Sequence, residues 1–491
     1  MSPTATNTSV SPAKARSRGV PTVVALLMLS GIALDVQYGI LYPLVGTIAA
    51  ESQLTASEIG WVLNGMMLGT AVSIGLTTRL GDTYGHRKVL IAVTILAMLG
   101  SLLAATVVGF WPLVIGRFLG GTAASIPLSW GLLRPRATAD RIRLSALALS
   151  LVMAIFTPLA IVIGGFFHSL GLPWQSVFWV IFAAYATLLL LALVAPETPE
   201  AALAGSAVDW FGAIGLGLWV TALLIGISEG PTRGWSSPLV LGGFIVGGLV
   251  LVAWVFQQRN AKAPIMSFRH MDVRQAVVGY MTLLAATIPA QGLFVVLPLL
   301  LQTPTDSGFG HGMSALESAY VLLAMLPGSC LGYVWTRWGL HRLGPKWVLV
   351  ISGIAGFVLY LGFAFVQTPS WIFYVWVFFY GLTVLSFLTV GYTLVAASGR
   401  QDNMAVTVGM QTIVQFVSSM IVLAVILNVL NAGPQGFIPQ ETFAAVYLGM
   451  GASILVFIVL WLLFAPRRIT DLHAIDTETD PQRITADDVV L

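Results

Sequence analysis

The sequence is poor in charge and nearly free of cysteine. Of its 491 residues one is cysteine, Cys330, and 9% are Asp, Glu, Lys or Arg. A single cysteine excludes disulfide bonds within the chain, and its position in an apolar stretch favours a packing role over a reactive one. So little charge cannot cover a water-soluble globule, and 57% of the residues are hydrophobic. The composition therefore predicts an integral membrane protein.

Sequence signatures of catalysis and of ATP use are missing as well. The chain has no GxxxxGK[ST] loop for nucleotide phosphates, no His–Glu cluster for a metal within an apolar stretch, and no nucleophile paired with a base. We therefore expect neither an enzyme nor a resident cofactor or metal, and ATP is excluded as a direct energy source. The formal net charge of +3 raises the question of nucleic acid binding, which the distribution of the basic residues answers.

Apolar stretches of at least 18 residues recur along the chain. Each can cross the roughly 30 Å hydrocarbon layer as a helix, which satisfies its own backbone hydrogen bonds in lipid. The first follows basic residues as in a signal peptide, but it is too long for a cleaved apolar core and is predicted to be retained. The sequence therefore predicts an all-α fold with fourteen transmembrane helices. They lie near residues 20–45, 58–78, 87–108, 110–133, 144–168, 175–195, 210–228, 237–256, 275–302, 315–336, 345–366, 371–396, 405–430 and 441–464.

Lys and Arg residues concentrate in alternate loops between these stretches. Of the 23 basic residues, 21 fall on the side that also carries both chain ends, whereas Arg233 lies in an opposite loop and Arg117 within a stretch. Because basic loops stay on the cytoplasmic side, the pattern predicts a multi-pass protein of the cell membrane with both termini in the cytoplasm. The basic residues then serve topology rather than nucleic acid binding, and the lipid bilayer is the expected surrounding.

Residues 79–88, RLGDTYGHRK, gather charge between the second and third stretches. Charge alone predicts no more than a cytoplasmic turn whose bases hold two helices in register. The segment resembles the loop between helices 2 and 3 of major facilitator superfamily transporters, with Thr83 and His86 where that family usually has basic residues. The resemblance implies a conformational latch that forms in one state and parts in the other, with Gly85 allowing the sharp turn and Asp82 accepting hydrogen bonds. The matching residues are Arg79, Gly81, Asp82, Gly85, Arg87 and Lys88.

A faint internal repeat supports two related halves. The segment TRWGLHRLGPKWVL at 336–349 echoes TRLGDTYGHRKVLI at 78–91, as expected for a transporter built from two six-helix repeats. Between the halves, VDWFGAIGLGL, GISEGPTRGWSS and APIMSFRHMDVR resemble the linker of the fourteen-helix drug:proton antiporter family, and the resemblance extends over about residues 20–465. It implies a cytoplasmic tail, a six-helix half, a linker with two extra helices, a second six-helix half and a second cytoplasmic tail, at 1–19, 20–196, 197–274, 275–465 and 466–491.

Two ionisable side chains lie unambiguously inside the predicted spans. Asp35 in the first and Arg117 in the fourth have a similar depth, counted at about 1.5 Å per residue, and charge inside a membrane points to function. An acid and a base at one depth can pair, and a cationic substrate can then exchange against a proton on Asp35; a purely structural ion pair is the alternative. LDVQYGILYP and RFLGGTAASIP resemble the antiporter motifs of helices 1 and 4, which implies proton coupling by Asp35 and Arg117.

Uncharged polar side chains within several stretches predict the wall of a substrate cavity. Interhelical hydrogen bonding is the alternative role for the same side chains. Tyr38 and Tyr42 share the face of Asp35. Acidic residues are missing from the faces of the other candidates, so we expect an amphiphilic or singly charged small molecule as the substrate. The candidates are Tyr38, Tyr42, Asn64, Thr287, Gln291, Gln411 and Gln415.

The fifth stretch contains the segment TPLAIVIGG. It resembles the helix-5 motif of the antiporters, although the proline stands further from the glycine pair. Pro158 predicts a kink, and Gly164 and Gly165 predict a close approach of another helix.

These features together favour a proton-coupled secondary active transporter. Proton influx is the expected energy source, and export of small amphiphilic molecules by alternating access is the expected reaction. The family resemblance implies a monomer. Two alternatives stay open on the same fold: a facilitated transporter of a specific metabolite, and a transport-silent sensor or scaffold.

Overall fold

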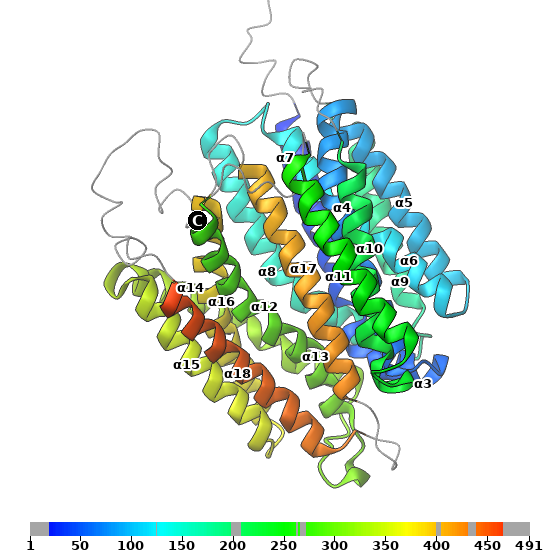
Figure 1. Cartoon of the computed structure of the whole chain (residues 1–491), viewed down its shortest axis with the longest axis vertical. Helices are drawn as coiled ribbons and strands as arrows, with labels where there is room; N and C mark the ends of the chain where they lie inside the picture. The colour runs from blue at the N-terminus through cyan, green and yellow to red at the C-terminus, as the bar shows by residue number, and fades with distance from the viewer. Residues whose placement is uncertain are drawn as a thin grey trace, which may run out of the picture.

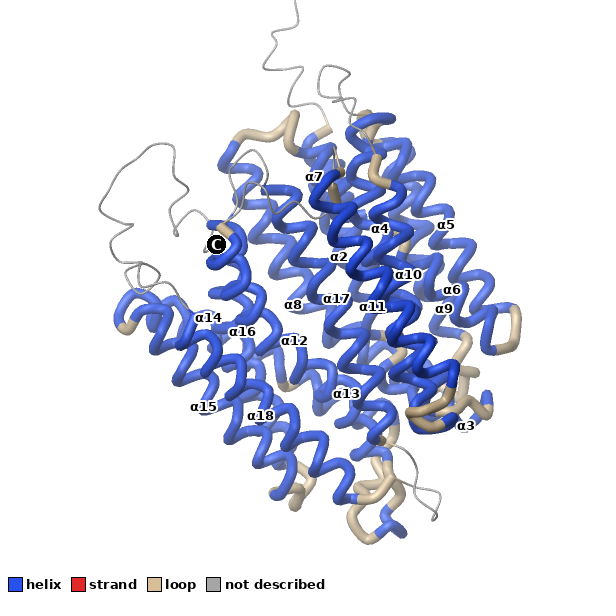
Figure 2. Tube along the Cα trace, in the orientation of Figure 1, coloured by secondary structure: helices blue, strands red, loops and turns tan. Residues whose placement is uncertain are grey.

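The computed structural model describes residues 19–123, 125–197, 208–261, 264–265, 272–398, 404–430 and 438–464. Within these ranges the regular elements are helices, and no strand occurs among them (Figure 1 and Figure 2). The predicted all-α fold is therefore confirmed. The C-terminal tail and all but the last residue of the N-terminal tail fall outside the described residues.

The described chain up to residue 194 forms the first group of helices. Helix α4 begins with a reciprocal cap: the Thr55 side chain accepts from the N–H of Glu58 at 3.3 Å, and the Glu58 side chain accepts from the N–H of Thr55 at 2.8 Å. The elements are α2 (Val20–Gly39), the 3₁₀ helix η1 (Tyr42–Leu44), α3 (Val45–Ser52), α4 (Ala56–Tyr84), α5 (His86–Thr106), α6 (Phe110–Gly121), α7 (Ser125–Leu133), α8 (Ala139–Ser169) and α9 (Ser176–Val194).

The remaining described helices comprise an inserted pair and a second group. Helices α10 and α11 form a hairpin, and α10 also packs against α4 of the first group and α17 of the second. The elements are α10 (Trp210–Arg233), α11 (Pro238–Asn260), α12 (Val273–Gln302), η3 (Thr305–Ser307), α13 (Ala315–Leu323), α14 (Met325–Arg342), α15 (Gly344–Phe365), α16 (Ile372–Ser398), α17 (Met404–Val429) and α18 (Gln440–Phe464). The exact domain limits stay a prediction.

Thirteen helical segments in the described residues are long and apolar enough to cross a membrane. The predicted span 110–133 is divided between α6, which ends at Gly121, and α7, which begins at Ser125; adjacent glycines weaken a helix. The first span runs on through η1 and α3 to Ser52, beyond the predicted end at residue 45. The α-helix is interrupted at η1, where Pro43 lacks the N–H that a continuous helix needs.

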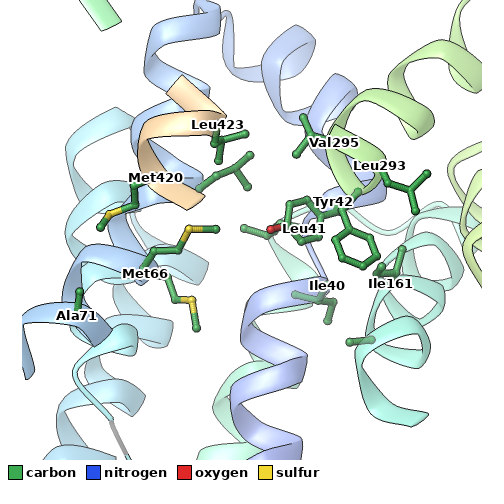
Figure 3. Packing of buried hydrophobic residues seen from close by; sticks show 14 of the residues in the cluster. Ile40, Leu41, Tyr42, Met66, Ala71, Ile161, Leu293, Val295, Met420 and Leu423 are labelled. Atoms are coloured by element: carbon green, nitrogen blue, oxygen red, sulfur yellow. The ribbon is translucent and has the colours of Figure 1, made fainter. Parts of the chain in front are cut away.

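Buried apolar side chains from both groups of helices meet in one cluster (Figure 3). Ile40 and Tyr42 follow α2, Met66 lies on α4, Leu293 on α12 and Met420 on α17, and each is at most 2% exposed. The flexible side chains of the two methionines fill the space between α4 and α17. The cluster therefore joins the two groups of helices near the interruption of the first span.

Cys330 corrects one expectation from the sequence. It is exposed on α14 rather than packed in the interior, and its neighbours Leu331 and Val334 are each more than half exposed. In a membrane protein the lipid-facing and the buried sides of a helix are equally apolar. Hydrophobicity along the sequence therefore could not tell which side Cys330 occupies.

The two ends of the helix bundle are packed differently. We call them the Gly85 end, which carries the α4–α5 turn, and the Gln53 end, which carries the α3–α4 turn. At the Gln53 end the two groups touch: Gln302 Nε2 donates to the carbonyl of Pro43 at 2.9 Å, and a Cβ on Gly165 of α8 would lie 2.8 Å from the α13 backbone. The α4–α5 and α14–α15 turns stand well apart (Figure 1). The structure is closed at the Gln53 end and spread at the Gly85 end.

Candidate functional site

Asp35 is buried on the face of α2 that packs against α8. Gly39, one turn further on, approaches α8 so closely that a Cβ there would lie 3.1 Å from the carbonyl oxygen of Thr157. Asp35 is 5% exposed, Thr157 is the neighbour of its carboxyl group, and its Oδ2 atom has no hydrogen-bond partner in the described part of the chain. The site therefore holds a carboxyl group with hydrogen-bonding capacity to spare, in a place where an uncompensated charge is costly.

Arg117 lies on α6 and is 2% exposed. Its guanidinium donates to two backbone carbonyls, from Nη1 to Gln37 on α2 and from Nε to Val62 on α4 at 3.3 Å. Gln37 is one of the last four residues of α2, whose carbonyls lack partners within their own helix. Arg117 thus supplies a hydrogen-bond donor to an α2 carbonyl next to the interruption of that helix. Its two contacts connect α6 with both α2 and α4.

The ion pair that equal depth suggested between Asp35 and Arg117 is not formed. No salt bridge within 4.0 Å joins them in the residues that the structure describes. Asp35 precedes Gln37 by two positions, a rotation of about 200° around the helix axis, so the carboxyl group faces α8 while Arg117 approaches from α6. Depth follows from counting residues, but the direction of a side chain depends on how the helices are arranged.

Gln37 and Tyr185 lie beside Arg117 and were missed from the sequence. The amide of Gln37 contacts the hydroxyl of Tyr185 on α9, and both residues are at most 2% exposed. Gln37 was visible as a polar residue inside an apolar stretch, but it lies off the face that Asp35 defines. The sequence did not single out Tyr185, because a tyrosine inside a span serves as a packing residue as often as it serves as a hydrogen-bonding residue.

Tyr38, Tyr42 and Gln291 meet at the junction of the two groups. Gln291 Nε2 on α12 donates to the Tyr38 hydroxyl at 2.6 Å, and the ring of Tyr42 stacks on Phe294 with centroids 5.8 Å apart. The rings of Tyr38 and Tyr42 meet edge to face at 5.4 Å. These predicted cavity residues therefore form an interhelical contact in the present conformation.

Asn64 makes a second contact between the groups. Its Nδ2 atom donates to the backbone carbonyl of Met420 on α17 at 3.3 Å. The side-chain oxygens of Asn64 and Gln291 are both buried and have no hydrogen-bond partner in the described ranges. Unpaired buried oxygens lower the stability of this contact between the two groups.

Thr287 and Gln415 lie together within the second group. Gln415 Nε2 is 3.5 Å from Thr287 Oγ1 and 3.4 Å from the hydroxyl of Tyr392. These distances are long for hydrogen bonds, and Tyr392 is 39% exposed. Gln411, one turn before Gln415, is buried. The seven predicted cavity residues therefore fall into a junction group and a second-half group, and their role in substrate binding stays a prediction.

The predicted latch occupies the α4–α5 turn. Gly85 has a φ of +101°, which favours glycine, and Asp82 Oδ1 lies 3.3 Å from His86 Nε2. Gly81 is buried, and a Cβ there would lie 2.8 Å from Leu128 of α7. Asp82 therefore bonds to a residue of the same turn, and the turn packs on α7.

Arg87 of the latch and Arg136, which follows α7, contact the end of α9 and the residues after it. Arg87 Nε donates to the carbonyl of Ala192 at 2.9 Å, and its backbone N–H donates to Glu197 Oε1 at 3.1 Å. Arg136, after α7, donates to the carbonyl of Glu197, and burial lowers the pKa of its guanidinium while the charge of Glu197 opposes the shift. These contacts all lie within the first group of helices and the residues that directly follow it.

Arg79 and Lys88 lie on either side of the same turn. Arg79 is half-buried on α4 and Lys88 is exposed on α5. Both therefore stand at the spread end of the bundle.

The helix-5 residues all lie on α8. Pro158 is inside the helix, beside the Asp35 neighbour Thr157. A Cβ on Gly164 would overlap the carbonyl oxygen of Ile40, where the first span is interrupted, and Gly165 faces α13. The glycine pair thus contacts both the first span and the second group of helices.

Comparison with known proteins identifies the family. The model of the Major Facilitator Superfamily matches residues 27–423. The chain belongs to this superfamily. Its members are transporters rather than enzymes, and the fold is shared with solved transporters: the nucleoside transporter NupG aligns with a TM-score of 0.62 at 14% identity, covering 90% of this chain and 98% of that one.

Two curated relatives show the range of the family around this chain. The tetracenomycin C resistance and export protein of Streptomyces glaucescens is 26% identical over 349 residues, which is 69% of this chain and 62% of that protein. The uridine/deoxyuridine transporter of Lactococcus lactis is 26% identical over 391 residues, 75% of this chain and 78% of that protein. The chain spans 62% of the length of the exporter and of several other curated relatives.

Proposed function

We propose that this protein is a proton-coupled antiporter of the fourteen-helix drug:proton type, exporting amphiphilic or singly charged small molecules by alternating access. Superfamily membership supplies the reaction class, secondary transport. The likeness to the tetracenomycin C resistance and export protein supports the direction. The likeness to a uridine/deoxyuridine transporter supports a second candidate, facilitated transport of a specific metabolite.

One observation carries the proton coupling. Asp35 is an acid buried within a span, and its Oδ2 atom has no hydrogen-bond partner among the described residues. A carboxyl group in this position exchanges a proton when its surroundings change between conformations. The proton gradient is then the energy source, with Arg117 holding α2 beside the acid.

The orientation and the state are part of the same proposal. We place the Gly85 end in the cytoplasm, together with both termini, so that the present conformation faces inward. The latch then lies on the open side, bonded within its own half. On closure of that end, Arg79 and Lys88 are the charges that reach the second half.

The substrate site is proposed at the junction of the halves, in a monomer within the cell membrane. Gln291 at the junction, together with Gln411 and Gln415 of the second-half group, contributes uncharged hydrogen-bonding groups, and Tyr38 and Tyr42 contribute aromatic surface. A site of this composition suits a molecule with an apolar body and at most one charge. A polycation would find Asp35 as its single buried acid among the described residues of this region.

The test is proton movement in proteoliposomes that carry either the wild type or Asp35→Asn. A pH-sensitive dye in the lumen reports while ethidium, tetraphenylphosphonium, chloramphenicol or uridine is added. We expect at least one of the first three compounds to evoke proton movement in the wild type. None should do so in Asp35→Asn, because the side-chain amide of asparagine does not bind a proton near neutral pH. Ser129→Ala, a buried hydroxyl between α2 and α7, is the control and should retain the signal.

Different failures point to different alternatives. Movement of uridine across the membrane without movement of protons favours the facilitated transporter. Binding of compounds without any movement favours a sensor or scaffold. Proton movement that survives in Asp35→Asn leaves transport intact and refutes the assignment of Asp35.

A further inference from the structure

The side chain of Gln37 is a joint between three helices. It lies two residues after Asp35, and its amide contacts the hydroxyl of Tyr185 on α9. In the orientation that satisfies both ends of the amide, its nitrogen also donates to the carbonyl of Gly120 at 3.2 Å and its oxygen accepts from the N–H of Gly121 at 3.3 Å. One buried side chain thus connects α2, α9 and the end of α6.

Close packing around the Gln37 amide fixes its position. A Cβ on Gly120 would overlap the Gln37 amide, so only glycine allows this approach to the backbone. Tyr185 is 1% exposed, and its hydroxyl lies 3.5 Å from the carbonyl of Gly120. The amide is therefore held by packing as well as by hydrogen bonds.

The backbone of Gln37 also binds Arg117. Its carbonyl accepts from the guanidinium, which binds Val62 of α4 with its other side. The helix of Gln37 ends at Gly39, and α6 ends at Gly121. Gln37 therefore lies where two interrupted helices meet, and interrupted helices are the places where transporters move and bind ions.

We propose that Gln37 and Tyr185 are positioning residues for proton coupling. They keep the α2 carbonyl on Arg117, so that a change of proton occupancy at Asp35 is passed through residues 35–37 to α4, α6 and α9. This inference rests on the proposed function, because it needs Asp35 as the proton site. Neither residue binds the proton or the substrate itself.

The physical reason is the stiffness of a short segment. With the amide bound on one side and the carbonyl on the other, residues 35–37 move together with their partners. Without the amide contacts, α2 can shift at its interruption while Arg117 stays in place. Protons then cross without a matching movement of substrate, and the number of substrate molecules exported per proton falls.

The test measures that ratio in Gln37→Met, Tyr185→Phe and the double variant. Methionine keeps the length of glutamine and phenylalanine keeps the ring, so packing is conserved while the hydrogen bond is removed. In proteoliposomes, with whichever compound of the panel above the wild type exports best, we expect each single variant to lower the ratio by about fivefold, the factor of one buried hydrogen bond. The KM for the compound should change by less than about twofold. The double variant should be no worse than Gln37→Met alone, because Gln37→Met already removes the contact that Tyr185→Phe removes.

A buried amide elsewhere provides the matched control. Gln367 is 6% exposed and donates to the carbonyl of Phe363 at 3.0 Å, in the second half. Gln367→Met should leave the ratio at the wild-type value. Melting temperatures of all variants in detergent separate a loss of stability from a loss of coupling.

The outcomes divide cleanly. If folded Gln37→Met and Tyr185→Phe export as many substrate molecules per proton as the wild type, the inference is overturned and the proposed function still stands. An additive loss in the double variant has the same meaning. If Gln37→Met fails to fold, Tyr185→Phe decides, since it removes a single oxygen. A wild type that moves no protons with any compound of the panel overturns the proposed function and the coupling role with it.

Discussion

At the scale of single residues, glycines set how closely the helices of the first half approach. A Cβ on Gly121 of α6 would overlap the carbonyl oxygen of Met66 on α4, and a Cβ on Gly116 would lie 2.9 Å from the Cβ of Ala104 on α5. Small residues allow such backbone contacts between helices in lipid, where no hydrophobic force drives them together. The position of Arg117 between these glycines depends on that close approach.

We predict that Gly121→Val strongly destabilises the protein. Overpacking typically costs about 1–3 kcal/mol, and here the obstacle is backbone that cannot rotate away. The melting temperature in detergent, followed by size-exclusion chromatography after heating, should fall well below that of the wild type. Gly248→Val on α11 is the control, because a Cβ at that position meets nothing within 4 Å. Equal melting temperatures for the two variants would contradict this account of the packing.

At the scale of elements, the inserted hairpin is held at one end by a polar cluster. The carboxylate of Asp209 caps α10 by accepting from the N–H of Gly212 at 2.8 Å, and it also accepts from the amides of Gln257 and Gln258 on α11 at 2.7 and 2.6 Å. Trp254 Nε1 donates to the carbonyl of Gly212 at 2.6 Å. The start of α10 is thereby bound to the end of α11.

We predict that Asp209→Ala loosens this hairpin more than Ser237→Ala. Loss of an N-cap costs roughly 0.5–2 kcal/mol, and at Asp209 two further amides lose their partner, whereas Ser237 caps α11 through one contact of 3.4 Å. Hydrogen exchange of the first turn of α10 should accelerate several-fold in Asp209→Ala and stay close to wild type in the other variant. The reverse order would show that the polar cluster does not hold the hairpin.

At the scale of the whole molecule, the two halves meet at one end and spread at the other. A Cβ on Gly60 of α4 would lie 3.3 Å from the side chain of Leu427 on α17, close to the Gln53 end. At the Gly85 end, Arg87 bonds to α9 and Arg274 bonds to the last residue of α18 at 3.1 Å, each within its own half. Alternating access requires the first set of contacts to break as the other end closes.

We predict that a cross-link between positions 60 and 427 stops transport. The background is Cys330→Ser, which we expect to be tolerated because Cys330 is exposed. Gly60→Cys and Leu427→Cys are joined by a short thiol-specific cross-linker, and the product is identified by mass spectrometry. Export of the best panel compound should fall to background, because the halves can no longer part at the Gln53 end.

The control cross-link lies within one half. Gly356→Cys and Ile454→Cys on α15 and α18, where a Cβ at 356 would be 3.2 Å from the Ile454 side chain, should leave most of the export in place. Full export in the Gly60–Leu427 cross-linked protein would refute a cycle in which the halves part there.

The fold was largely predictable from the sequence, and the site only in part. The positions of Asp35 and Arg117 inside apolar spans stand out without a structure, because charge in lipid is rare and costly. The contacts of these two residues could not be predicted in the same way. Equal depth suggested an ion pair, whereas in the structure Asp35 faces α8 and Arg117 donates to carbonyls of α2 and α4. Gln37, which joins these helices, carried too weak a signal to be chosen.

The sequence by itself determined what depends on one helix at a time: that the chain is helical, which segments are apolar enough to span a membrane, and where Gly85 makes a turn. These follow from local hydrophobicity, backbone preferences and the cost of unpaired backbone groups in lipid. Only the tertiary structure decided which faces meet, that Cys330 points outward, that the first and fourth spans are interrupted beside Gln37, and which end of the bundle is closed. The reason is that lipid-facing and buried helix surfaces have the same composition, so the direction of a side chain is settled only when the helices pack.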